Sequence, residues 1–416
     1  MSRELGRYRW RICALLFFAT TLNYLDRQVV GILAGDLQRT FGWSETDYAN
    51  IVVAFQVAYA LGLVSMGSIL DRVGTRRGYA AGVALWSVAG MAHALANSVL
   101  GFASARFALG FAEAANFPAA VKTVAEWFPK TERALATGIF NSGANIGAIV
   151  APIVVPIIAV TWGWRWAFIL TGSLGFVWLG FWLATYRRPE LNPKLSAGEL
   201  AYIQADGVEP HERIPWARLL PHRETITVCL LKFVTDPVWW FFLFWLPKFL
   251  QQRYGVSLLE FGPPLVVVYL SSDVGSVAGG WLSSHFVKTG HSIDYARKRS
   301  ILICGMFALP IFFASRTDSM WLAVALISLG TAAHQACSTN IYTIMSDVFP
   351  KRSVGSIVGL AGMSGAISGA LVAEFVGIVL QTTHSYAIIF GMFSVAYIAA
   401  WFILRVGIPR IQPIEL

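Results

Sequence analysis

Residues 67–77 read Gly67-Ser-Ile-Leu-Asp71-Arg72-Val-Gly74-Thr-Arg76-Arg77, and this short polar stretch joins two long apolar runs. The runs cover residues 47–70 and 78–97. Each has about the 20 residues that a helix needs to cross roughly 30 Å of hydrocarbon in a bilayer. The pattern therefore predicts two membrane-spanning helices with a positively charged loop between them.

The same pattern continues in both directions along the chain and predicts twelve spans in all. The other ten are expected at 11–34, 100–125, 133–160, 164–186, 224–250, 259–286, 298–315, 319–345, 354–380 and 385–406. Residues 187–223 are rich in proline and charge, which indicates a linker outside the membrane. We therefore predict an all-α integral membrane protein, with six-helix bundles at 1–186 and 224–416 and a central cavity.

The composition and the placement of charge agree with this prediction. Of the 416 residues, 56% are hydrophobic and only 13% are charged, against about 25% in soluble domains. One alternating set of loops and termini carries 23 of the 32 Lys and Arg residues, and the opposite set carries five. By the positive-inside rule, both termini and the linker are expected to be cytoplasmic, in a cell inner membrane. The net charge of +9 is thus explained without a nucleic-acid partner.

Motifs of enzymes and of cofactor sites are absent from the sequence. It has no HExxH, no GxSxG and no glycine-rich phosphate cradle. The cysteines are widely separated within apolar runs: Cys13, Cys229, Cys304 and Cys337. We expect no metal, no cofactor and no catalytic residues, so an intramembrane enzyme is a remote alternative.

The two halves contain a weak internal repeat. Glu126-Trp-Phe-Pro-Lys130 is followed eight residues later by Gly138, and Asp347-Val-Phe-Pro-Lys351 is followed eight residues later by Gly359. The offset is 221 residues in both cases. Parallel repeats on either side of a linker are typical of transporters in which two bundles rock about a site near the middle of the membrane.

The loop at 67–77 resembles the signature of the major facilitator superfamily. The resemblance implies a cytoplasmic gate motif made of Gly67, Asp71, Arg72, Gly74, Arg76 and Arg77. In that motif a glycine allows close helix contact, the acid pairs with a neighbouring helix end, and the basic residues anchor at the membrane surface. Thr75 occupies a position that is usually basic, which is a small departure.

Two further motifs are similar to those of the anion:cation symporter family, and to its hexuronate transporters in particular. They are Asn23-Tyr24-Leu25-Asp26-Arg27 and Arg106-Phe-Ala-Leu-Gly110-Phe-Ala-Glu113-Ala-Ala-Asn-Phe117-Pro118. The resemblance implies proton-coupled symport of a small sugar-acid anion such as glucuronate or galacturonate, the proton being the coupling ion. Alternatives are symport of an aldonate or aldarate, such as galactonate or glucarate, and organic-anion exchange. We expect a monomer.

Ionisable residues within the spans are costly, about 2.5 to 3.5 kcal/mol each on insertion scales, and so they mark working sites. An acid such as Asp26 can load and release a proton when its surroundings change, and the forked guanidinium of Arg27 suits a carboxylate. The resemblance implies proton coupling by Asp26 and Glu113 and substrate binding by Arg27. Arg106 is expected as a supporting charge; the alternative is a static pair of Asp26 with Arg27 or Arg106. Pro118 is expected to loosen the helix near Glu113.

The seventh span places Lys232, Asp236 and Trp240 on one helix face at intervals of four residues. Lys232 is a candidate second cation for the substrate, with Asp236 as its supporting charge and Trp240 as a wall against the sugar. The alternative is a self-neutralising pair of Lys232 and Asp236. Pro237 is expected to break the helix where a gate would bend.

Sugar hydroxyls that lose water need neutral hydrogen-bonding partners. The candidates near the middle of their spans are Tyr24, Tyr59, Asn145, Gln335 and Asn340. The family resemblance supports Tyr59 as a substrate contact. Each of these polar residues has an alternative role in helix–helix packing, worth about 0.6 kcal/mol on average.

Overall fold

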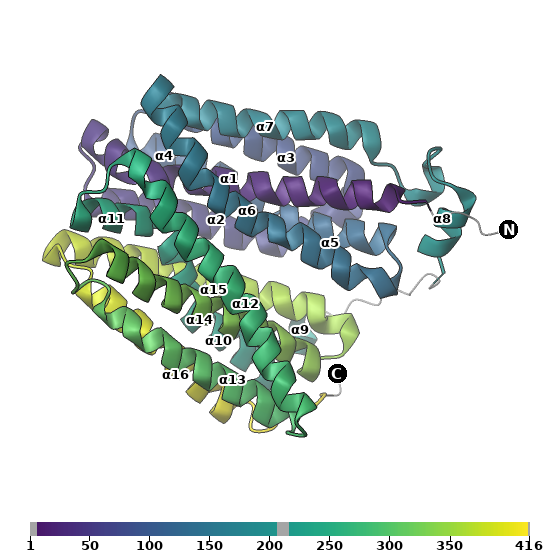
Figure 1. The fold of residues 1–416 in the computed structure, drawn as a ribbon. Helices are drawn as coiled ribbons and strands as arrows, with labels where there is room; N and C mark the ends of the chain where they lie inside the picture. The colour runs from purple at the N-terminus through teal and green to yellow at the C-terminus, as the bar shows by residue number, and fades with distance from the viewer. Residues whose placement is uncertain (1–5, 206–215, 415–416) are drawn as a thin grey trace. The chain divides into compact units, whose positions relative to one another are not determined.

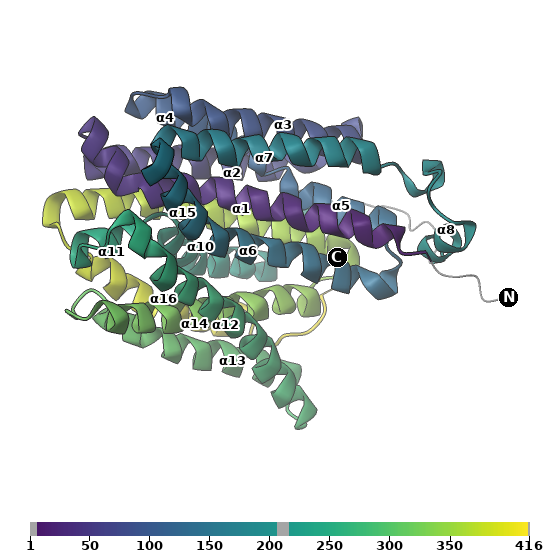
Figure 2. The same cartoon turned by 45° about the horizontal axis from the view of Figure 1, so that its top comes forward.

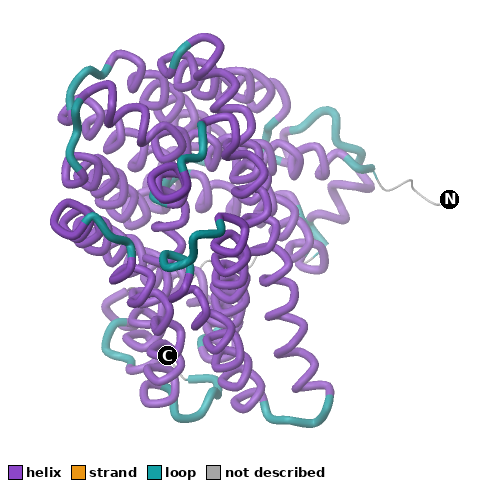
Figure 3. Tube along the Cα trace, turned by 60° about the vertical axis from the view of Figure 1, so that its left-hand side comes forward, coloured by secondary structure: helices purple, strands orange, loops and turns teal. Residues whose placement is uncertain are grey.

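The computed structural model of the protein describes residues 6–205 and 216–414 (Figure 1). Over these ranges the chain forms helices joined by short turns, and Figure 3 shows helix and loop without a strand in the described part. The prediction of an all-α protein is therefore confirmed. The side chains of a few helical residues, among them Asp71 and Lys351, lie outside the described part.

Each of the six apolar runs in the first half forms helix. The helices are α1 (Tyr8–Phe41), α2 (Glu45–Val73), α3 (Thr75–Ala92), α4 (Val99–Glu113), α5 (Asn116–Trp127), α6 (Lys130–Trp162) and α7 (Trp164–Thr185), with a 3-10 turn η1 (His93–Leu95). The fourth run is divided between α4 and α5 because Pro118 lacks an N–H and its ring clashes with the carbonyl of Ala114, where the helix is interrupted. The expected loosening near Glu113 is thus confirmed.

The second half repeats this arrangement after the described parts of the linker, which contain η2 (Pro189–Leu191), α8 (Ala197–Ile203) and α9 (Trp216–Leu219). The helices are α10 (Arg223–Phe244), α11 (Leu246–Tyr254), α12 (Gly262–Lys288), α13 (Ile293–Ala308), α14 (Met320–Val348), α15 (Lys351–Thr383) and α16 (Ala387–Gly407), with 3-10 turns η3 (Leu258–Phe261) and η4 (Leu309–Phe313).

The prediction that Pro237 breaks the seventh span is wrong. Helix α10 continues through Pro237 and ends at Phe244, and the chain turns at Trp245 before α11 begins. Pro247 lies in the first turn of α11, where its missing N–H costs no hydrogen bond and its ring disfavours continuation from α10. The second proline of the run therefore determines the position of the break.

Eight helices of the described chain are long and apolar enough to span a membrane by length and composition alone. They lie in α2, α6, α7, α10, the segment from η3 through α12, α14, α15 and α16. The other four expected spans correspond to α1, α3, the pair α4 and α5, and α13. α1 carries charged residues along its length, and α4, α5 and α13 are shorter than 18 residues.

By its internal contacts the chain divides into two compact units. Unit 1 contains residues 1–29 and 61–211, and unit 2 contains residues 30–60 and 212–416. The ends of α1 and α2 that face each other across the Gly42 turn therefore belong to unit 2. The domain limits drawn from the sequence at 186 and 224 stay a prediction.

In unit 1, small residues bring α3 and α7 close together along their length (Figure 2). A Cβ built on Gly175 of α7 would overlap the Ser87 hydroxyl of α3, and one on Gly172 would lie 3.0 Å from Ser87 O. Tyr79 of α3 packs edge-on against Trp182 of α7, with ring centroids 5.1 Å apart. Such close approach at small residues is the usual way in which helices associate in a bilayer.

The linker helix α8 is attached to the start of α1, beside which it lies in Figure 2. Glu199 of α8 accepts hydrogen bonds from Tyr8 N at 3.1 Å and from Arg9 N at 3.1 Å, and its carboxylate also pairs with Arg9 Nη1 at 3.0 Å. Arg9 further pairs with Glu132 of α6 at 2.7 Å, and this hydrogen bond holds the pKa of the Glu132 carboxyl below its usual range. These contacts fasten the first part of the linker to unit 1.

In unit 2, α12 and α14 make an equally close contact. A Cβ built on Gly275 would overlap the backbone of Ala332, and one on Gly279 would lie 2.5 Å from the Cα of Ala336. Gly280, one position further on, faces Thr339 with ordinary van der Waals spacing of 3.7 Å. The pair Gly275 and Gly279 therefore sets the distance between these two helices.

We expect Gly275→Val to destabilise the protein, because a side chain at this position meets backbone that cannot move aside without separating α12 from α14. Overpacking of this kind costs about 1 to 3 kcal/mol. The melting temperature of the purified protein in detergent measures the effect, with Gly280→Val as the matched control. Equal melting temperatures of the two variants would contradict the close packing at Gly275.

Candidate functional site

Four charged side chains are buried together in unit 1. Asp26 and Arg27 come from α1, and Arg106 and Glu113 come from α4, all with exposed fractions of 4% or less. Charge at this depth is expensive unless it is paired or faces a cavity. The contacts of each group therefore show what it is able to do.

Arg27 and Glu113 form a buried ion pair. The Nε atom of Arg27 donates to Glu113 Oε2 at 2.9 Å, and its Nη2 donates to Asn23 Oδ1 at 3.1 Å. Arg106 Nη2 donates to the backbone oxygen of Arg27 at 2.9 Å. The candidate substrate cation and one candidate proton carrier are thus bonded to each other, a link that the separate sequence assignments did not include.

Asp26 has different surroundings. Neither of its carboxylate oxygens has a hydrogen-bond partner of good geometry among the described residues, although the Thr171 hydroxyl of α7 lies close by. No ion pair joins Asp26 to Arg27 or Arg106 in the described part of the chain, so the alternative of a static pair is not seen. The described residues of this cluster therefore include one acid in an ion pair, Glu113, and one acid outside any ion pair, Asp26.

The interruption between α4 and α5 lies directly beside these charges. Glu113 is the last residue of α4, and its backbone oxygen accepts a hydrogen bond from Asn23 Nδ2 at 3.4 Å. Asn116, the first residue of α5, donates to the Thr20 hydroxyl at 3.2 Å and accepts from Tyr79 at 2.6 Å. Polar side chains of α1 and α3 thus satisfy the backbone and side chains around the break.

Two neutral candidates lie on neighbouring surfaces of unit 1. The ring of Tyr24 lies 4.6 Å from the guanidinium carbon of Arg27. Asn145 is half-buried on α6, two residues from Gly143 and Gly147, whose Cβ positions would overlap the backbone of α1. α6 is therefore held close to α1 at the level of Tyr24, and Asn145 lies at the edge of that contact.

In unit 2, the candidates of α10 form a charged pair and an aromatic cluster. Lys232 Nζ pairs with Asp236 Oδ1 at 2.7 Å and lies 3.4 Å from the hydroxyl of Tyr342. The self-neutralising pair that the spacing allowed is therefore present. Gly365 of α15 permits it, since a Cβ there would overlap the Asp236 carboxylate.

Tyr59 and Trp240 belong to one aromatic cluster within unit 2. Their ring centroids lie 5.9 Å apart in an edge-on arrangement, and Trp240 stacks on Phe244 at 5.8 Å. Both candidates are buried, with exposed fractions of 8% and 9%. Gly369 of α15 brings its backbone against the indole of Trp240.

Helix α14 carries two of the neutral candidates, Asn340 and Gln335, and the hydrogen bonds of Asn340 indicate its role. Asn340 Nδ2 donates to Gly279 O of α12 at 3.1 Å and to Ala336 O at 2.9 Å, within the close contact between the two helices. This geometry favours the packing role for its amide nitrogen, while its Oδ1 has no partner among the described residues. Gln335 is half-buried on the same helix.

Two buried glutamines were missed by sequence reasoning. Gln28 follows Arg27 on α1, and Gln56 lies three residues before Tyr59 on α2. Both side chains are fully buried, and neither amide has a hydrogen-bond partner among the described residues. An uncompensated buried amide costs about 1 to 3 kcal/mol, which a bound hydroxylated ligand would offset. The sequence feature that could have identified them is a polar amide within an apolar run, close to a residue that is already a candidate for the site.

The motif at 67–77 contains a one-residue turn between two long helices. Gly74 is the single residue between α2 and α3 and has φ of 85°, a left-handed conformation that favours glycine. Arg72, Arg76 and Arg77 are exposed around it, while the side chain of Asp71 lies outside the described part. No described atom lies within 4 Å of a Cβ built on Gly67, so the close helix contact expected there is not seen in the described residues.

Comparison with known proteins agrees with this architecture. The model of the Major Facilitator Superfamily matches residues 16–373. The hexuronate transporter of Escherichia coli is 33% identical over 94% of this chain and 92% of its own length. The D-galactonate transporter of Escherichia coli is 31% identical over 97% and 96%, and a probable galactarate/D-glucarate transporter of Bacillus subtilis is 29% identical over 97% and 93%.

Solved structures show the same fold at lower identity. A crystal structure of a D-xylose-proton symporter superimposes with a TM-score of 0.75 at 16% identity, covering 95% of this chain and 97% of that one. A bacterial homologue of the human lysosomal transporter Spinster superimposes with a TM-score of 0.72 at 18% identity, covering 97% and 96%.

The fold and the buried charges define a multi-pass membrane transporter rather than an enzyme. The chain belongs to the Major Facilitator Superfamily. Its fold is therefore the twelve-helix arrangement of that superfamily, as the sequence predicted.

Proposed function

We propose that the protein is a secondary active transporter that carries a sugar-acid anion together with protons by alternating access. The observation that carries this proposal is the cluster of unit 1, where Asp26 makes no ion pair among the described residues and lies near the Arg27–Glu113 ion pair. Entry of an anion at Arg27 would weaken its bond to Glu113, and the released carboxylate would then favour a proton. Binding of the anion and binding of the proton are thereby coupled.

The substrate class follows from charge and from neutral hydrogen-bonding groups together. Arg27 supplies a forked donor for a carboxylate, and the unpartnered amide of Gln28 in the same unit matches a hydroxyl group. Relatives named for hexuronate, galactonate and galactarate or glucarate transport support the same class. We propose that the substrate is a hexuronate, namely glucuronate or galacturonate.

Two alternatives to hexuronate symport remain in order of preference. The D-galactonate transporter is nearly as similar in sequence, so an aldonate or aldarate is the second candidate. Organic-anion exchange is the third. An inner-membrane location, a monomeric state and the proton as sole coupling ion belong to the same proposal. The distribution of Lys and Arg in the loops supports its further element, that both termini are cytoplasmic.

Uptake into proteoliposomes tests the proposal. Labelled glucuronate, galacturonate and galactonate are supplied separately, with and without an inward proton gradient, and with sodium replaced by potassium in a parallel set. We expect accumulation of a hexuronate that requires the proton gradient and not sodium. Accumulation of galactonate alone would move the assignment to the aldonates, and exchange without any gradient dependence would contradict symport.

The pair in unit 2 provides a prediction about the second cation. Lys232→Ala leaves Asp236 buried without its partner, and the like charge of Asp236 then opposes an incoming anion. We expect glucuronate to bind at least tenfold more weakly, as is typical when one partner of a buried charge pair is removed, at a cost of about 2 to 5 kcal/mol. Calorimetric titration with glucuronate measures the change.

The double variant Lys232→Ala/Asp236→Ala is the control for that measurement. It removes the uncompensated acid and so should recover folding stability. If the double variant binds glucuronate as tightly as the wild type, the pair has a packing role only.

A further inference from the structure

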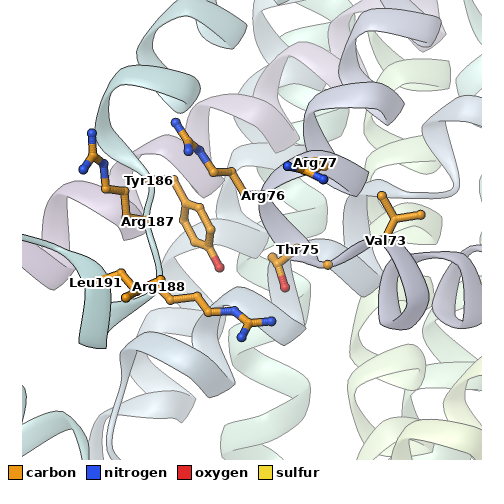
Figure 4. Close-up of a pocket in the computed structure, with 9 residues that line it drawn as sticks. Val73, Thr75, Arg76, Arg77, Tyr186, Arg187, Arg188 and Leu191 are labelled. Atoms are coloured by element: carbon orange, nitrogen blue, oxygen red, sulfur yellow. The ribbon is translucent and has the colours of Figure 1, made fainter.

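An open pocket of about 580 Å³ lies in unit 1, away from the buried charge cluster, where the α2–α3 turn meets the segment that follows α7. Four arginines from these two segments line it. Figure 4 shows Arg76, Arg77, Arg187 and Arg188 around the ring of Tyr186. Tyr186 is buried, whereas the four arginines are exposed and their long side chains are able to turn toward a ligand.

Among the described residues, no ion pair neutralises the positive charge of this pocket. None of the four arginines has an ion pair within the described chain, and Arg76 Nη2 donates a hydrogen bond to Leu183 O at 2.6 Å. Among the described residues, Glu126 lies near this pocket and accepts hydrogen bonds from the Thr75 hydroxyl at 2.6 Å and from the Tyr186 hydroxyl. The described residues that line the pocket thus include four arginines and no acid.

The backbone adds to the same field. Helix α3 begins at Thr75, directly beside the pocket, and no side chain caps its N-terminus. Its first turn contains Arg76 and Arg77 and no acid, although the positive end of a helix dipole favours anions and disfavours cations there. The free N–H groups, the dipole and the four arginines therefore all favour a multiply hydrogen-bonding anion.

We propose that this pocket is a binding site for a phosphate group, presented by an anionic phospholipid headgroup or by soluble phosphate. Apolar side chains beside the arginines favour the lipid. Val73 and Leu191 line the pocket with exposed fractions of 49% and 70%, and Leu183 next to Arg76 is 43% exposed. Exposed apolar groups next to a basic pocket match the junction between a headgroup and its acyl chains.

The test uses the full-length protein and native mass spectrometry in detergent. Phosphatidylglycerol and phosphatidylcholine are titrated separately onto the wild type, onto Arg187→Gln/Arg188→Gln and onto the control Arg405→Gln/Arg410→Gln, which removes two arginines from the end of the other unit. We expect the wild type and the control to bind phosphatidylglycerol more tightly than phosphatidylcholine. The first variant should lose about tenfold or more of that preference, given about 1 kcal/mol for each arginine.

A second arm separates the two sources of phosphate. Inorganic phosphate competing with phosphatidylglycerol at millimolar concentration would show that a soluble anion suffices, and absence of competition would assign the site to the lipid. Loss of the preference in the control to the same extent, or its retention in Arg187→Gln/Arg188→Gln, would overturn the proposal. If that variant fails to fold, Arg76→Gln/Arg77→Gln removes the other half of the pocket and tests the same prediction.

Discussion

Asp26→Asn is expected to abolish uphill uptake of the sugar acid while leaving exchange across the membrane measurable. Asp26 is buried and makes neither an ion pair nor a well-formed hydrogen bond among the described residues, so it is the group most free to change its protonation. Asparagine keeps the shape of the side chain and removes the titration. The variant should still bind and release the anion, but a proton gradient should no longer drive it.

The expected size of the accumulation follows from the pH gradient across the membrane. One pH unit stores about 1.4 kcal/mol per coupled proton, which allows about tenfold accumulation of the substrate. In proteoliposomes with a two-unit gradient, the wild type should concentrate the anion far above the outside level, and Asp26→Asn should reach a ratio near one. Counterflow of labelled against unlabelled substrate checks that translocation survives.

A control on the same helix removes a surface acid in the same way. Asp36→Asn deletes the partly exposed partner of the exposed Arg39, and surface pairs of this kind contribute about 0 to 1 kcal/mol. Its accumulation should equal that of the wild type. Concentrative uptake by Asp26→Asn at the wild-type level would remove Asp26 from the coupling mechanism.

Arg27→Gln is expected to have two separable effects, on stability and on substrate binding. It leaves the Glu113 carboxylate buried without the guanidinium that lies 2.9 Å away in the wild type. Breaking a buried ion pair from one side costs about 3 to 5 kcal/mol. The purified variant should therefore melt well below the wild type and should bind glucuronate too weakly to detect.

The double variant Arg27→Gln/Glu113→Gln separates these effects. It removes both charges, so most of the lost stability should return, while binding of the anion should not. Arg253→Gln is the control for a pair at the surface, because Arg253 and its partner Asp318 are 42% and 96% exposed. Wild-type affinity in the double variant would show that Arg27 does not hold the substrate, and an unchanged melting temperature of Arg27→Gln would show that the pair does not stabilise the fold.

Hydropathy and proline chemistry were enough to predict much of the fold. Each of the twelve apolar runs is helical in the structure, and the interruption after Glu113 follows from Pro118. The same reasoning failed at Pro237, which is accommodated inside α10. A proline within a helix leaves one backbone group to be satisfied by its neighbours, and local sequence does not show whether those neighbours can do so.

The candidate site was predictable residue by residue but not in its connections. A charged residue in an apolar run is visible in the sequence because burying it is costly, and Asp26, Arg27, Arg106 and Glu113 were found in this way. Gln28 and Gln56 were missed because an amide costs less and stands out less. Their significance lies in the absence of a partner, which is a property of three-dimensional surroundings.

By itself, then, the sequence determined that this protein is an all-helical membrane transporter with a short set of charges inside the membrane, since hydropathy and charge act through composition along each helix. Only the tertiary structure decided that Arg27 bonds to Glu113, 86 residues away, and leaves Asp26 outside any ion pair among the described residues. It also decided that four arginines from two separate segments line one pocket. Pairing depends on which helix faces pack together, and that choice is made by contacts between segments distant in the chain.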